Sequence, residues 1–236
     1  MGALGIVAAL AAEARPLAAG RRRVHGSLAL AADVTLAVGG VGRLRAGDAA
    51  RQLLADGARA LVSWGTAGGL DPALEPGRLV LAERVLSEAG EEWAADAAWL
   101  ARIRAALPPE VDASSGAVFA SSRVLAGPAD KSACFATTGA LAVDMESAAV
   151  AESAARAGVP FVVIRVVCDA AGTRIPHCAL KSVGPDGRLR PLGFLRTLAR
   201  DPRQLRGVLE MDRSFRRARK TMERVVGALG PRLAAP

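Results

Sequence analysis

Short apolar runs alternate with alanine-rich stretches along most of this chain, and such alternation is typical of an α/β sheet protein. The runs that predict strands are residues 4–10, 34–38, 60–64, 78–85, 116–121, 141–143 and 161–167. The stretches with helical signals are residues 43–55, 93–107 and 148–157. Glycines or prolines follow each predicted helix and end it. The pattern therefore predicts one α/β domain.

The pattern changes after Asp169. Residues 170–192 are rich in glycine, proline and charge and predict a loop or lid, and helical spacing returns from Gly193. Apolar residues then recur three or four positions apart, with arginines between them: Leu205, Val208, Met211, Phe215, Ala218, Met222, Val225 and Leu229. We therefore divide the chain into a catalytic domain at 1–180 and a basic helical C-terminal extension at 181–236, packed on the same domain.

Composition is that of a soluble protein. The chain has 236 residues, 51% of them hydrophobic, which is enough for one full core. Three cysteines, with no CxxC pair, predict free thiols in a reducing compartment. The first apolar run has no cationic segment before it and reads as a strand, so we expect no signal peptide and a cytoplasmic protein.

The net charge of +8 is concentrated in the C-terminal extension. Residues 181–236 carry fourteen basic and five acidic side chains, whereas residues 1–180 are nearly neutral. Such a segment suits an anionic membrane surface, and it fits a solvated helical face equally well. Only 3% of the residues are aromatic, and without stacking side chains or a recognisable motif we expect no nucleic-acid binding.

Three acidic residues stand at ends of predicted elements, where ligand sites of α/β sheets gather. Glu13 follows the first strand, Glu146 begins a helix, and Asp169 ends the most apolar strand. A single acid in such a place is usually a cap or an ion-pair partner. Three of them, beside the glycine-bearing segment 65–69, predict a shared site.

Four motifs carry a resemblance to a known family. They are Leu4–Leu10 with Glu13, Ser63–Gly69, Val143–Ala149 and Val159–Asp169. In this order they resemble the methylthioadenosine/adenosylhomocysteine nucleosidases of the nucleoside phosphorylase superfamily. The resemblance implies a single-domain, three-layer α/β/α fold with a central mixed sheet. It also implies cleavage of the N-glycosidic bond between a purine and a ribose-type sugar.

The resemblance implies three catalytic residues. Asp169 is similar to the acid that protonates the purine, and we expect the apolar strand before it to raise its pKa by desolvation. Glu146 resembles the residue that hydrogen-bonds the ribose hydroxyls. Glu13 resembles the base that takes a proton from the attacking water.

The resemblance also implies substrate-binding residues. Thr66 and the backbone of Ala67 and Gly68 would hold the nucleophile through N–H groups left free in a tight turn. Met145 would lie against the sugar, although a methionine there also fits a core position. Val124 falls where the family places a residue that stacks on the base.

Two positions depart from the pattern. Asp144 replaces the first glutamate of the Glu-Met-Glu signature, and we keep it among the substrate-binding residues. Ser63 stands where phosphorylases carry a phosphate-binding arginine, and serine cannot make those bidentate contacts. We therefore expect water as the nucleophile, while Arg15 and Arg43 leave a phosphate contact open.

The C-terminal segment narrows the expected substrate. Residues 182–205 and 61–74 resemble the hopanoid-associated phosphorylase branch, which implies adenosylhopane as substrate, with adenine and ribosylhopane as products. A lipid-linked nucleoside requires docking at a membrane, which a basic amphipathic helix provides. The open alternatives are phosphorolysis, a soluble substrate such as methylthioadenosine, adenosylhomocysteine or futalosine, and a silent purine-binding scaffold.

We expect no metal and no cofactor. His25 and His177 lie far apart without metal-ligand spacing, and no nucleotide-binding glycine motif is present. Relatives of this fold complete their sites across a dimer, so the resemblance implies a homodimer.

Overall fold

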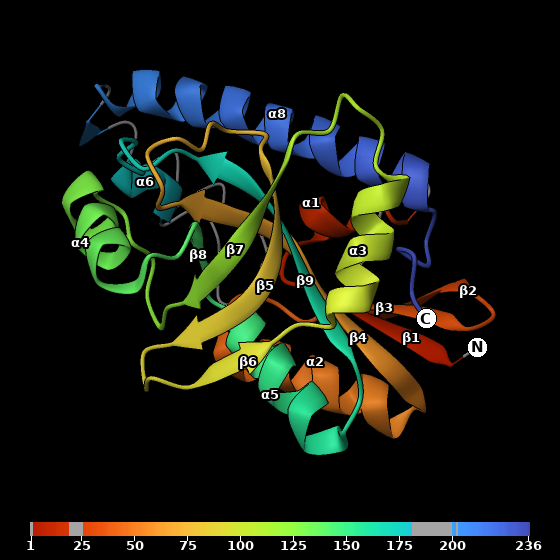
Figure 1. Ribbon diagram of the computed structural model, residues 1–236. Coiled ribbons are helices and arrows are strands. Elements are labelled where there is room, and N and C mark those ends of the chain that lie inside the picture. The colour runs from red at the N-terminus through yellow and green to blue at the C-terminus, as the bar shows by residue number, and fades with distance from the viewer. Residues whose placement is uncertain (1, 19–25, 181–199, 202) are drawn as a thin grey trace.

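One mixed sheet organises the computed structural model, which describes residues 2–18, 26–180, 200–201 and 203–236 (Figure 1). Its strands are β1 (Ala3–Ala8), β2 (Gly26–Ala31), β3 (Val34–Val38), β4 (Ala58–Gly69), β5 (Leu79–Ser87), β6 (Glu92–Ala94), β7 (Ala113–Ala120), β8 (Ala142–Asp144) and β9 (Phe161–Asp169). The order among them is β2-β3-β1-β4-β8-β7-β5-β6, and β9 pairs with both β4 and β5. Parallel pairing of β1, β4 and β9 brings their carboxyl ends to one edge.

Helices cover both faces of the sheet (Figure 1). They are α1 (Ala11–Ala14), α2 (Arg43–Ala55), α3 (Ala97–Ala106), α4 (Pro128–Thr138), α5 (Ser147–Ala157), α6 (His177–Leu180) and α8 (Gln204–Leu229). Alternate residues of β9 feed two cores. Val162, Ile164 and Val166 pack with α3 and α8, whereas Phe161 and Val163 pack with α2 and α5. This arrangement confirms the three-layer α/β/α fold and its mixed sheet.

The long C-terminal helix α8 contributes to the core. Ala218, Met222 and Val225 of α8 are buried against the sheet face that carries β9. Beyond the helix, the carbonyl of Leu233 accepts a hydrogen bond from Trp99 Nε1 at 2.8 Å. From residue 203 onward, the predicted helical extension therefore packs on the catalytic domain. Residues 181–199, which belong to the predicted lid and extension, are outside the described part of the chain.

Among the local predictions that were wrong, two bear on the site. Residues 65–69, predicted as a tight turn, continue β4, because Thr66 pairs with Val166 and Gly68 with Val143. Helix α4 was missed since it has no apolar stripe, and its buried residue is Lys131. Pairing and burial decided by other segments override the local signal in both places.

Candidate active site

A single cavity opens where β1, β4, β8 and β9 end. It gathers every residue that the sequence placed in a site: Glu13, Thr66, Ala67, Gly68, Val124, Asp144, Met145, Glu146 and Asp169. These residues are far apart along the chain, and the parallel pairing of β1, β4 and β9 brings most of them to the same edge of the sheet.

Glu13 is buried and held by three donors. Its Oε1 accepts hydrogen bonds from Thr66 N at 2.8 Å and Thr66 Oγ1 at 2.7 Å, and its Oε2 accepts from Leu10 N at 3.0 Å. Gly65 makes this approach feasible, since a Cβ at Gly65 would lie 3.0–3.1 Å from the Glu13 carboxylate atoms. The carboxylate is thus fixed at the cavity wall while remaining part of its lining.

The small residues of β4 serve packing as well as the cavity. The N–H and hydroxyl of Thr66 are already bonded to Glu13, so the free turn donors expected from the sequence are absent at this residue. A Cβ at Gly68 would lie 3.2 Å from Asp169 Oδ2 and 3.3 Å from Val143 Cγ1. A side chain at this point of β4 would therefore press on the Asp169 carboxylate and on β8.

Glu146 projects into the cavity from the start of α5. Its Oε1 accepts from Gly42 N at 2.7 Å and its Oε2 from Met145 N at 3.3 Å. Burial, with the nearby charge of Asp144, raises the pKa of Glu146 to about 7. The side chain is therefore poised to change charge near neutral pH.

Asp144 is committed to the protein's own structure. Its Oδ1 accepts from Ser147 N at 3.1 Å and Ser147 Oγ at 2.7 Å, and thereby caps α5. Its Oδ2 accepts from Arg165 Nε at 2.6 Å, and Arg165 Nη2 donates to Ser63 Oγ at 2.6 Å. The buried Arg165, missed from the sequence because it sits in an apolar strand, thus joins Asp144 to Ser63 beneath the cavity.

Asp169 has a partner that the sequence did not reveal. The buried Lys131 of α4 donates to Asp169 Oδ2, and Cys168 Sγ donates to Asp169 Oδ1 at 3.2 Å. Burial and the charge of Asp169 raise the pKa of the Cys168 thiol. The sequence predicted an apolar environment acting on Asp169 alone, whereas the structure sets an ammonium group against it.

Part of the cavity lining is apolar. Val124, which is 43% exposed, lies in it beside Arg123, and Val41, Met145 and Ile175 are further apolar members. Within the described residues, no group of three His, Cys, Asp or Glu side chains is arranged to hold a metal ion. The chemistry that this cavity offers is proton transfer and charge stabilisation by Glu13, Glu146 and Asp169.

The chain has relatives among known proteins in both sequence and structure. A nucleosidase for 5′-methylthioadenosine and S-adenosylhomocysteine from Marinomonas sp. is 30% identical over 165 residues, which are 61% of this chain and 71% of that protein. The Neisseria meningitidis enzyme of that name, solved with methylthio-immucillin-A, aligns at a TM-score of 0.69 and 18% identity over 96% of this chain and 99% of that one. A futalosine hydrolase mutant from Helicobacter pylori aligns at a TM-score of 0.61 and 17% identity, over 71% of this chain and 89% of that one.

The two structural matches share the three-layer fold. The sequence match to the Marinomonas protein indicates common descent. The profile of the phosphorylase superfamily matches residues 4–179, which include the four motifs and every predicted site residue. With its cavity built from those motifs at the carboxyl edge of the sheet, the chain belongs to the phosphorylase superfamily.

Proposed function

We propose that this protein hydrolyses the N-glycosidic bond of an adenine nucleoside. The observation that carries the proposal is the convergence of Glu13, Glu146 and Asp169 on one cavity from three separate elements. The Marinomonas relative, which this chain matches over 71% of that protein's length, is named a nucleosidase for two adenine nucleosides.

Each carboxyl group has a distinct task in this reaction. Cleavage builds positive charge on the sugar and negative charge on the departing purine. Asp169 gives a proton to the purine, Glu146 binds the ribose hydroxyls and faces the cationic sugar, and Glu13 takes the proton of the attacking water. Met145, beside Glu146 in the lining, contacts the sugar.

Water is the proposed nucleophile because two of the donors expected for phosphate, Thr66 and Arg43, are already engaged. Thr66 donates twice to Glu13, and a phosphate at that position would lie against the Glu13 carboxylate. Ser63 is buried and hydrogen-bonded to Arg165. As a neutral side chain it supplies no positive charge that could bind phosphate. Arg43 pairs with Glu152 at 2.7 Å and is not part of the lining.

We propose adenosylhopane, a lipid-linked adenine nucleoside, as the substrate. The apolar lining residues Val124 and Ile175 suit an apolar substituent on the sugar. Ile175 leads into α6, which touches the start of α8 where Gln204 Oε1 accepts from Cys178 N at 3.0 Å. The cavity lining at Ile175 is therefore linked through α6 to the basic helix.

Helix α8 is the proposed contact with anionic lipid headgroups at the inner membrane face. Leu205 and Leu209 are each 49% exposed near its start, and Arg213 and Lys220 are exposed further along the helix. Apolar side chains flanked by cations are typical of helices that lie in the membrane interface. Within the described residues, no helix is long and apolar enough to span a bilayer.

Charge reversal tests this contact without removing core residues. Arg213→Glu with Lys220→Glu should weaken binding to vesicles containing phosphatidylserine, since each basic residue contributes up to about 1 kcal/mol there. Arg51→Glu with Arg156→Glu, on α2 and α5 across the sheet, is the matched control (Figure 1). Equal vesicle binding by both variants would refute the contact.

We also propose a homodimer. Leu44 is 83% exposed at the first turn of α2, two residues after Gly42, which binds Glu146. A large apolar side chain in this place fits a subunit interface near the cavity. Light scattering should give twice the monomer mass, and a monomer at micromolar concentration would contradict the proposal.

Adenine release, followed by chromatography, tests the reaction itself. The substrates are adenosylhopane in detergent and methylthioadenosine, each with and without phosphate. Phosphate-independent release from adenosylhopane is the expected result. Preference for methylthioadenosine would support the proposed reaction and reject the lipid substrate. Strict dependence on phosphate would show that the enzyme is a phosphorylase. Adenine binding without turnover would indicate a purine-binding scaffold.

A further inference from the structure

Lys131 is a buried cation outside the cavity lining. It lies in the first turns of α4 and its side chain is fully buried. A charged group is rarely buried in this way unless it is paired. Here the ammonium donates to Asp169 Oδ2, to Ala170 O at 2.8 Å and to Thr173 O at 3.3 Å. All three ammonium protons therefore have acceptors.

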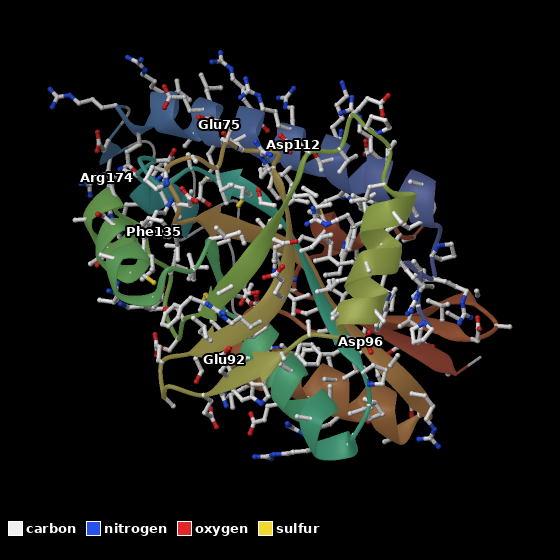
Figure 2. The ribbon with its side chains drawn as sticks, in the orientation of Figure 1. Glu75, Glu92, Asp96, Asp112, Phe135 and Arg174 are labelled. Carbon is white, nitrogen blue, oxygen red and sulfur yellow. The ribbon has the colours of Figure 1, made fainter. Side chains whose placement is uncertain are left out.

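The acceptors lie on one short segment that borders the cavity. Asp169 ends β9, Ala170 and Thr173 follow it, and Ile175 N donates to Ala126 O at 2.9 Å. Arg174 lies beside Gly127, where α4 begins (Figure 2). Lys131 thus connects α4 to the end of β9 and to the segment that carries Ile175 into the cavity wall.

We propose that Lys131 is a positioning residue that holds the Asp169 carboxyl group toward the purine and balances the charge left on it. The inference rests on the proposed function of Asp169 as the acid. When the glycosidic bond breaks, its electrons pass to the purine and the Asp169 proton moves to the purine ring. Asp169 then remains as a carboxylate, and the Lys131 ammonium beside it stabilises that state. Lys131 keeps its own protons throughout and does not touch the substrate.

Lys131→Met tests the charge at nearly constant side-chain length. We expect kcat to fall roughly 10²-fold, as for the loss of one preorganised electrostatic contact, with a smaller change in KM. Lys131→Arg retains the cation and should keep most of the wild-type kcat. Arg51→Met, which removes an exposed cation paired with Asp48 on α2, is the control.

A double-mutant cycle separates positioning from general structural support. In the Asp169→Asn background, Lys131→Met should cause no further loss of kcat, because its effect passes through Asp169. The double variant also removes the uncompensated buried charge, so it should be more thermostable than Lys131→Met alone. If Lys131→Met does not fold, the double variant and Lys131→Arg supply the comparison.

Binding of free adenine, measured by calorimetry, gives a readout besides turnover. Loss of adenine affinity in Lys131→Met and in Asp169→Asn, without a further loss in the double variant, supports the inference about Lys131. If the wild-type protein binds adenine in this way but cleaves no nucleoside, the proposed function is rejected and the inference about Lys131 is not. A wild-type kcat in Lys131→Met, additive losses in the cycle, or wild-type adenine binding by Lys131→Met would overturn the role of Lys131.

Discussion

Glu146 offers a prediction about stability that needs no substrate. Its pKa is raised from 4.5 to about 7 by burial and by the charge of Asp144. The folded protein therefore binds a proton at this site over a pH range where the unfolded chain has lost it. Stability from this group is complete at pH values below about 4.5, and it is lost as the pH rises through about 7.

The size of the effect follows from the two pKa values. The full loss amounts to about 3 kcal/mol of unfolding free energy, and roughly 2–3 kcal/mol of it falls between pH 5 and pH 8. Glu146→Gln removes the ionisation and keeps a carbonyl that can accept from Gly42 N. The substitution should therefore become more favourable relative to wild type as the pH rises.

Thermal unfolding followed by circular dichroism measures this difference. For a chain of this size, about 1 kcal/mol shifts Tm by about 2–4 °C. The Tm difference between Glu146→Gln and wild type should be roughly 5–10 °C more positive at pH 8 than at pH 5. Glu75→Gln makes the same chemical change at an exposed site in the loop before β5 (Figure 2) and is the control. A Tm difference for Glu146→Gln that is equal at both pH values would refute the reasoning.

Three further predictions concern activity. Asp169→Asn should lower kcat by about 10²–10⁴-fold with unchanged circular dichroism, since an amide cannot supply the proton; turnover like that of wild type would reject its role as the acid. Glu13→Gln should reduce hydrolysis by about 10²–10⁴-fold, and an equal loss of any phosphorolysis would argue against a water base. Gly65→Ala should displace the Glu13 carboxylate, whose atoms lie 3.0–3.1 Å from the added Cβ, and lower kcat by about 10–100-fold. Gly227→Ala, which meets no atom within 4 Å on the exposed face of α8, is its control, and equal kcat in the two variants would contradict the packing argument.

Much of the fold was predictable because its signals are local. The apolar runs at 34–38 and 161–167 became β3 and β9, and the periodic stretch at 43–55 became α2. Gly158 ends α5 with a φ of 63°, a conformation in which glycine carries no Cβ penalty. These elements follow from alternation, helical spacing and end signals within a few residues.

Other elements depended on partners distant in the sequence. Residues 65–69 contain glycines that favour a turn, yet pairing with β8 and β9 on either side keeps them extended. Helix α4 buries a lysine where a pattern of apolar residues would be sought. The few residues around each of these segments do not show which strands pair with residues 65–69 or which groups surround Lys131. Prediction from the sequence therefore failed at both places.

The sequence by itself determined the α/β class, the superfamily motifs and the candidate residues that line the cavity, because strand ends and motif spacing follow from the order of residues along the chain. Only the tertiary structure decided how those residues are used. It set Thr66 against Glu13, Arg165 between Asp144 and Ser63, and Lys131 against Asp169. Each of these contacts joins residues that are at least twenty-one positions apart. The charge and hydrogen bonding of the site depend on such contacts, and they exist only once the sheet has brought its strand ends together.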